Sequence, residues 1–288
     1  MVNGQRFRVR PGQKVDLAGW PTRIEPLCGS KSEYQDILEK HVAQLSEQQQ
    51  LLYAADRYAL LLIFQGMDTA GKDGVIRHVM SGVNPQGCEV WSFRPPGPEE
   101  LKHDFLWRAA CRLPDRGRIG IFNRSYYEEV LIVRVHPELL REERPPRSAA
   151  HRSKLWGRRY RSIVEFERHL SANGTRIVKF FLHLSKGEQR RRLLARISDP
   201  DKHWKFSGAD IHERAFWRQY MHAYGQALSA TSTRHAPWYI IPADDKDDAR
   251  LVVSRIIVGA LAELKMTYPK LDAARRRMLR SIRKQLEH

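Results

Sequence analysis

The stretch "GMDTAGKD", residues 66–73, places two glycines, a lysine and two aspartates between an apolar run and a helical pattern. It matches the phosphate-loop pattern G-x-x-x-x-G-K as far as Lys72, but Asp73 stands where a hydroxyl residue usually binds Mg²⁺. The glycines let successive N–H groups turn inward, and the N-terminus of the following helix favours an anion. The pattern predicts a phosphate-binding loop, rather than an ordinary strand-to-helix turn, made by Gly66, Met67, Thr69, Ala70, Gly71, Lys72, Asp73 and Gly74.

The two aspartates of this loop raise a question of charge balance. A carboxylate beside bound phosphates repels them unless a cation lies between the two. We therefore expect Asp68 to hold a divalent metal ion or to orient the acceptor group. Asp73 either contributes to the same balance or is a first-turn acid that favours the helix dipole, and the sequence leaves both interpretations open.

Two longer segments follow the loop along the chain: "FNRSYYEEVLIVRVHPE" (residues 122–138) and "DPDKHWKFSGADIHERAFWRQY" (residues 199–220). With the loop, they make the chain resemble the polyphosphate kinase 2 family from about residue 30 to residue 268, and more closely its polyphosphate:nucleotide phosphotransferase branch. The resemblance implies a P-loop kinase sandwich with a helical lid. It also implies phosphoryl transfer between inorganic polyphosphate and nucleotides with Mg²⁺, or alternatively Mn²⁺, as cofactor.

The resemblance assigns roles in the segment that follows the third strand. Arg124 is expected to contact phosphate bidentately in catalysis, with a surface ion pair as the alternative. Asn123 stands where much of the family has Asp, so it can hold a metal through water but supplies no charge. Glu128, rather than Glu129, is expected to point into the site as a candidate metal ligand, with a helix-surface role as the alternative. An acid here resembles the pattern of enzymes that accept nucleoside monophosphates as well as diphosphates.

A strongly basic stretch, residues 186–205, is the expected lid. Arg192 and Arg196 share a helix face by their spacing, and the resemblance suggests one of them as the lid arginine that offsets charge on the transferred phosphoryl group. A solvated face is the alternative for any single cation of the run. Trp204 is expected to pack in the core rather than stack on a base. Further predictions are phosphate contacts for Arg77 and Lys205, a phosphate or structural pairing for Arg134, and a structural role for His136.

The net charge of +17, from 50 Lys and Arg against 33 Asp and Glu, indicates a polyanionic partner. Polyphosphate fits, because a chain without base or sugar must be held by a track of cations. Residues 141–161 and the basic tail are candidates for the outer part of that track. We expect inorganic polyphosphate and AMP, ADP or ATP as substrates, with GMP and GDP as further candidates, and no specific nucleic acid or membrane. An ATP-dependent small-molecule kinase and a nucleic-acid-binding protein are the competing hypotheses.

The elements that must position these residues follow from the alternation of apolar runs and helical patterns. Strands are predicted at residues 58–65, 87–93, 118–123, 176–184 and 237–243, and helices at 33–57, 72–80, 153–174 and 247–265. Residues 186–230 are expected to form two helices broken at 198–210. Nearly continuous apolar runs favour strands buried on both faces, so the fold class is α/β: a three-layer P-loop kinase-like sandwich with a mainly parallel five-stranded sheet and a helical lid.

The predicted domain organisation is a single domain. An N-terminal extension and helix (1–57) precede a core formed by residues 58–185 and 231–265, which is interrupted by a lid (186–230) and followed by a basic helical tail (266–288). Three cysteines lie far apart and form neither a disulfide framework nor a metal motif. With no signal peptide and no apolar run long enough to cross a bilayer, the expected location is the cytoplasm. A homo-oligomer is the expected assembly.

Overall fold

The computed structural model describes residues 4–142, 152–205 and 208–287 of the chain. Five strands form one sheet in the order β2-β3-β1-β4-β5, and every neighbouring pair is parallel. Their bounds are β1 (Ala59–Gln65), β2 (Cys88–Ser92), β3 (Ile119–Asn123), β4 (Thr175–His183) and β5 (Trp238–Pro242). The predicted α/β sandwich is confirmed, and each predicted strand is present.

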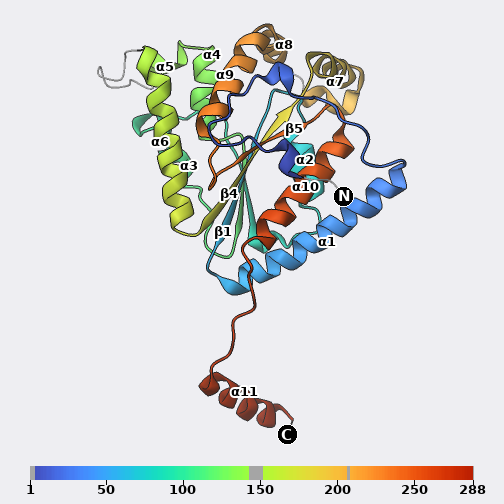
Figure 1. Ribbon diagram of the computed structural model, residues 1–288, viewed down its shortest axis with the longest axis vertical. Helices are drawn as coiled ribbons and strands as arrows, with labels where there is room; N and C mark the ends of the chain where they lie inside the picture. Colours follow the sequence, from blue (N-terminus) through green and yellow to red (C-terminus); the bar gives the residue numbers. More distant parts are fainter. Residues whose placement is uncertain (1–3, 143–151, 206–207, 288) are drawn as a thin grey trace.

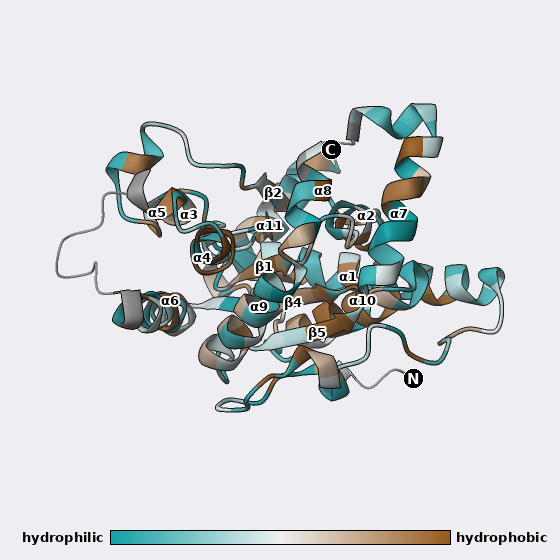
Figure 2. Cartoon of the chain, turned by 90° about the horizontal axis from the view of Figure 1, so that it is seen from above, coloured by the Kyte–Doolittle hydropathy of each residue, from teal (hydrophilic) through white to brown (hydrophobic). Residues whose placement is uncertain are grey.

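The two faces of the sheet are covered by different helices, which gives the three layers (Figure 1). On one face lie α1 (Lys31–Ala55), α2 (Lys72–Val79) and α10 (Lys246–Ala262); on the other lie α6 (Arg152–Ala172) and α9 (Trp217–Thr231). The central strand β1 is buried along its whole length. Its Leu60 and Leu62 pack toward the first face, and Leu61 and Ile63 toward the second. Figure 2 shows hydrophobic ribbon concentrated in this middle of the molecule.

The lid departs from the prediction in its number of helices. Where two were expected, the structure has α7 (Lys186–Ser198), a 3-10 helix at Pro200–Lys205, α8 (Gly208–Ala215) and then α9. The expected break after Ser198 is present. The expectation of one continuous second helix is wrong because Phe216 leaves the helical region, with φ −84° and ψ 17°, and separates α8 from α9.

The remaining helices are short, except for the helix of the C-terminal tail. Three brief helices, α3 (Trp107–Ala110), α4 (Ile132–Val135) and α5 (Leu139–Glu142), lie on connections, and a 3-10 helix at Tyr126–Val130 follows β3. The tail forms α11 (Ala273–Leu286), which lies apart from the body at the end of an extended segment (Figure 1) and has no buried residue. In the part of the chain that the structure describes, no helix has the length and apolar character needed to cross a membrane.

A buried polar network, which the sequence analysis did not find, lies between the sheet and α6. Lys179 of β4 and Glu167 of α6 are both 0% exposed, and their Nζ and Oε2 atoms lie 2.5 Å apart. The Tyr126 and Tyr127 hydroxyls both donate to the other Glu167 oxygen, at 2.9 Å. Because a buried carboxylate must be fully paired, this network fixes the backbone that follows β3, where the second predicted motif lies.

Candidate functional site

The glycine loop connects the carboxyl end of β1 to the first turn of α2, and steric constraints explain why Gly66 and Gly71 are glycines. A Cβ on Gly66 would lie 3.0 Å from the Leu182 carbonyl oxygen and 3.1 Å from the Ala70 Cβ, so a side chain would displace the loop from β4. Gly71 has φ +102°, a conformation that other residues rarely adopt, and it caps α2. The strand, loop and helix therefore stand in the order that the phosphate-loop pattern requires.

Lys72 turns back over the loop that precedes it. Its Nζ donates to the carbonyl oxygens of Gly66 at 2.7 Å and Met67 at 3.4 Å, and the residue is only 9% exposed. The pKa of Lys72 is lowered from 10.5 to about 8, first by burial and then by the charge of Arg124, while Asp68 and Glu128 act in the opposite direction. The ammonium is thus held by neutral carbonyl groups, in a position from which it can turn to an anion.

A cavity of ≈490 Å³ opens beside the loop at the carboxyl edge of the sheet. It brings together residues predicted from three separate segments of the sequence: Asp68, Thr69, Gly71, Lys72, Asp73, Gly74, Asn123, Arg124 and Arg196. In open α/β sheets, ligands bind at this edge of the strands. The loop, the motif after β3 and the lid therefore meet around one cavity.

Arg124 is the cation at the centre of the site's ion pairs. Its Nη2 lies 2.7 Å from an Asp68 oxygen and its Nη1 lies 3.4 Å from a Glu128 oxygen, with the arginine side chain 36% exposed. The adjacent carboxylates, Glu128 first and then Asp68, raise the pKa of Arg124 above its usual value. Its φ of +64° is unusual for a non-glycine residue and aims the side chain back at the loop.

The structure separates the two neighbouring glutamates. Glu128 pairs with Arg124 beside the cavity, whereas Glu129 is buried and its carboxylate lies 3.7 Å from Arg159 of α6. Arg159 also donates to the Glu129 carbonyl oxygen at 2.6 Å. Of the two acids, Glu128 is the one paired with a site residue, although it is not among the described residues that line the cavity.

Asp73 and Asn123 are fifty positions apart in sequence but are in contact at the cavity. The Asn123 Nδ2 donates to the Asp73 Oδ1 at 2.5 Å. Asp73 therefore faces the cavity, and the neutral amide of Asn123 stands beside it without adding a second negative charge.

These residues fit a divalent metal ion of the Mg²⁺ type. The carboxylates of Asp68 and Asp73 both line the cavity, and Mg²⁺ takes hard oxygen ligands, commonly one or two carboxylates with phosphate oxygens. No cluster of three or more His, Cys, Asp or Glu residues with metal-binding geometry occurs within the described residues.

The two arginines of α7 are placed differently, although they lie one turn apart. Arg192 is 7% exposed, and its guanidinium donates to the carbonyl oxygens of Thr69 at 3.0 Å, Ala70 at 3.1 Å and Ala243 at 2.6 Å. It lies beneath the loop and does not line the cavity. Arg196 does line the cavity, with its Nη1 3.6 Å from an Asp210 oxygen.

Other predicted residues lie at varying distances from this centre. Arg77 is exposed on α2 and is absent from the cavity lining, and the side chain of Lys205 lies outside the described part of the chain, as do residues 143–151 of the expected outer track. Arg134 donates to the Tyr160 hydroxyl at 2.7 Å, and His136 pairs with Glu213 at 2.9 Å, which are structural contacts.

Three residues at the site were missed or misjudged from the sequence. Trp204 was expected in the core, but it is 78% exposed and lines the cavity, because the lid holds it away from the sheet. Arg94 also lines the cavity and was not singled out. Its position directly after β2 was a usable signal, because parallel strands end at the same edge. Gln189 was missed as well: its amide donates to the Asp68 carbonyl oxygen at 3.1 Å and links α7 to the loop.

Comparisons with known proteins agree with this geometry. The family model described as "Polyphosphate kinase 2" matches residues 29–269. The chain is 58% identical over 285 residues to an ADP-polyphosphate phosphotransferase of Rhodopseudomonas palustris, covering 99% of each protein. It is 42% identical over 271 residues to an AMP/ADP-polyphosphate phosphotransferase of Meiothermus ruber, covering 94% of this chain and 97% of the relative.

A solved structure gives the same result for the fold. The crystal structure of polyphosphate kinase 2 from Arthrobacter aurescens TC1 superposes with a TM-score of 0.84 at 41% identity, covering 96% of this chain and 95% of that one. The family match spans the loop, the motif after β3 and the lid, which are the three segments that meet at the cavity. The chain belongs to the polyphosphate kinase 2 family.

Proposed function

We propose that the chain transfers the terminal phosphoryl group of inorganic polyphosphate to nucleoside mono- and diphosphates, converting AMP to ADP and ADP to ATP, and that it runs in reverse. The observation that carries this proposal is the convergence of Lys72, Arg124 and Arg196 with the glycine loop around one cavity. The activities named for the two relatives support polyphosphate as donor and AMP or ADP as acceptor.

The transfer needs little acid–base chemistry from the protein. An oxygen of the acceptor phosphate, already ionised, forms a bond to the terminal phosphorus as the bridging P–O bond of polyphosphate breaks. The bonding pair leaves with the shortened polyphosphate, so the step balances without a covalent enzyme intermediate. Lys72 and the loop N–H groups hold phosphate oxygens, while Arg124 offsets charge that develops on the transferred group.

A Mg²⁺ ion fits the cavity carboxylates, as described above, and when bound it would neutralise phosphate charge and bring donor and acceptor together. Asp68 and Asp73 would hold it, with Asn123 positioned to contact it through water. Asp68 also forms an ion pair with Arg124 at 2.7 Å.

The polyanionic donor is supported by the charge of the chain, +17, and by the cations of the lid. Affinity for polyphosphate should fall steeply as salt rises, because cations that bind the chain release its counterions. We extend the proposal to GMP and GDP as acceptors, to Mn²⁺ as an alternative metal, to a homo-oligomeric assembly and to a cytoplasmic location.

The test is a direct assay of the purified protein with polyphosphate and Mg²⁺, offering AMP, ADP, GMP and GDP separately. The expected result is ADP from AMP and ATP from ADP, resolved by chromatography. The absence of product with every acceptor contradicts the proposal. Release of ADP from ATP that needs no polyphosphate would favour an ATP-dependent small-molecule kinase, and a nucleic-acid gel shift without phosphotransfer would favour a nucleic-acid-binding protein.

A further inference from the structure

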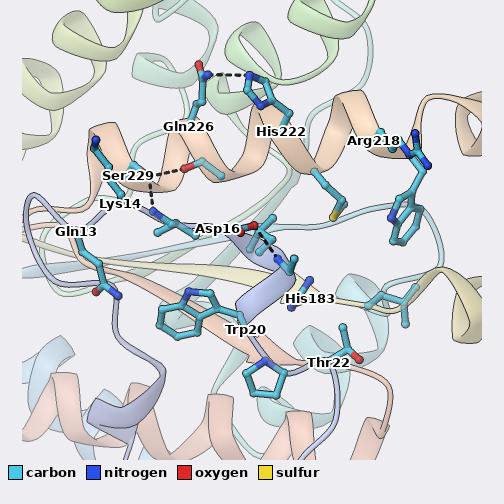
Figure 3. A pocket seen from close by; sticks show the side chains of 18 of the residues that line it. Gln13, Lys14, Asp16, Trp20, Thr22, His183, Arg218, His222, Gln226 and Ser229 are labelled. Carbon is cyan, nitrogen blue, oxygen red and sulfur yellow. Dashed lines mark hydrogen bonds between the residues drawn. The ribbon is translucent and has the colours of Figure 1, made fainter.

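A second hollow of ≈1340 Å³, larger than the loop cavity, lies between the N-terminal segment 12–23 and α9 (Figure 3). The carboxyl end of β4 and the start of α7, residues 183–186, also line it. Among the described residues, none lines both this groove and the loop cavity. The groove is therefore a separate feature from the proposed transfer site.

The walls of the groove are held in place by contacts between distant parts of the chain. The Val15 N–H donates to the Ser229 hydroxyl at 2.8 Å, and the Thr22 hydroxyl donates to an Asp244 oxygen at 2.9 Å. A Cβ on Gly225 would lie 2.9 Å from the Val15 carbonyl oxygen, so the glycine permits this close approach to α9. Segment 12–23 is thus fixed at both ends, and the groove is preformed.

The lining carries an excess of positive charge. Lys14, Arg23, Lys186 and Arg218 line the groove, and none of the four makes an ion pair within the described part of the chain. Asp16 is the one carboxylate among the described lining residues, and it accepts from the Ala18 N–H as a helix cap. Uncompensated cations around a hollow favour an anionic ligand.

Two indole rings line the same groove from different elements. Trp20 comes from the N-terminal segment and Trp217 from the first turn of α9, and both are only partly buried. Figure 3 shows Trp20 beside His183, with Arg218 toward one end and Lys14 toward the other. Flat apolar rings next to cations suit a ligand that has both an aromatic ring and an anionic group.

His183 forms part of the floor of the groove. It is 5% exposed, and its Nδ1 has no hydrogen-bond partner among the described residues. Burial lowers the pKa of His183, and a backbone hydrogen bond with Pro21 and the charge of Asp244 oppose that shift in part. A buried polar nitrogen without a partner is uncommon in a folded protein, and this one has almost no exposed surface, so we assign it no ligand contact.

We propose that this groove binds a nucleoside phosphate, with the base against one of its two indoles and the phosphates toward the cations of the lining, Arg218 and Lys186 among them. This site goes beyond the proposed function, because it lies apart from the cavity in which phosphate would be transferred. Polyphosphate alone would satisfy the cations, but it has no ring to pack against an indole. A nucleotide accounts for the cations and the aromatic lining together.

The test is equilibrium dialysis of radiolabelled ADP with Mg²⁺ and no polyphosphate. Wild-type protein is expected to bind two molecules per chain, and Arg218→Glu to weaken one of them by about tenfold or more. Lys186→Glu, a second exposed cation of the lining, should act in the same way. Arg116→Glu, an exposed arginine outside the lining, is the matched charge control and should bind as wild type does.

Each other outcome has a definite meaning. Binding of one ADP per chain, unchanged in Arg218→Glu and Lys186→Glu, overturns the groove proposal and leaves the transfer proposal standing if the enzyme is active. If excess polyphosphate displaces the ADP that Arg218→Glu loses, the groove accepts a polyanion without a base, and the proposal fails. Photolabelling with 8-azido-ADP is expected to mark a peptide from residues 12–23, and labelling confined to the loop would contradict it.

Discussion

The glycine-loop cavity and the buried Lys179–Glu167 pair both place a lysine among oxygen acceptors, but they differ in what those acceptors are. Lys179 is 0% exposed, and its Nζ contacts a Glu167 oxygen at 2.5 Å, the Tyr127 hydroxyl at 2.9 Å and the Thr231 carbonyl at 2.8 Å. Lys72 contacts neutral backbone carbonyls at the edge of a cavity.

The difference separates a structural charge from one available to a ligand. A buried ion pair with every donor satisfied holds its groups in one arrangement, and removing one partner leaves an uncompensated charge. A lysine held by carbonyls has no counter-charge of its own, so an anionic phosphate can take that place. The two regions are also connected, because the tyrosines bonded to Glu167 come directly after Arg124 and Ser125.

Removing the cavity lysine tests the difference between the two lysines most directly. Lys72→Ala is expected to lower kcat by about 10²–10³-fold, because a preorganised cation beside the phosphates is lost. The thermal unfolding curve should stay close to wild type, since burial of Lys72 as a cation is itself unfavourable. Product formation from polyphosphate and ADP, with circular dichroism on heating, measures both. Arg77→Ala is the matched control and should retain activity; a Lys72→Ala enzyme with the wild-type rate would exclude the loop as the transfer site.

The core pair should respond in the opposite manner. Lys179→Met alone is expected to reduce the free energy of unfolding by about 3–5 kcal/mol, because Glu167 is left buried without its counter-charge. The double variant Lys179→Met/Glu167→Leu should recover part of that loss, although the two tyrosine hydroxyls lose their acceptor. Urea denaturation gives the comparison. A double variant whose loss equals the sum of the two single losses would show that the charges are not coupled.

Arginines one turn apart on α7 allow a finer test of the same distinction. Arg192→Ala is expected to cost about 2–3 kcal/mol of stability, because its buried guanidinium holds loop carbonyls. Arg196→Ala should leave stability nearly unchanged and lower kcat by about tenfold or more, as expected for a cavity cation. Unfolding and turnover are measured on both variants. If Arg196→Ala lost stability and Arg192→Ala lost only activity, the structural and catalytic roles of the two arginines would have to be exchanged.

The smallest expected effect concerns pH. The free enzyme's kcat/KM should fall as pH rises through about 8, because Lys72 must be charged to hold phosphate. Since the folded pKa is lower than the unfolded value of 10.5, the unfolded state binds more protons between about 8 and 10.5. The contribution of Lys72 to stability therefore rises with pH across that window and is unfavourable below it. Rate profiles and unfolding from pH 7 to 10 test both signs, and a flat kcat/KM across pH 8 would argue against a role for charged Lys72.

Much of the fold was available from the sequence because its signals are local. Several of the five strands are nearly continuous apolar runs, and the loop is six residues between a strand and a helix, so each signal lies within one window of the chain. The lid was harder, because the break at Phe216 arises from backbone geometry rather than from a glycine or proline. Trp204 was misplaced because hydrophobic character alone does not determine whether a lid side chain reaches the core.

The sequence by itself determined the phosphate loop, the order of the three motifs along the chain and the family resemblance, since these depend on residue types at fixed spacing. Only the tertiary structure decided that Asp73 meets Asn123, that Glu129 is buried against Arg159 of α6, and that Arg192 lies beneath the loop. Spacing along a helix predicts which residues share a face, but it does not predict what packs against that face. That choice depends on contacts between segments far apart in the chain.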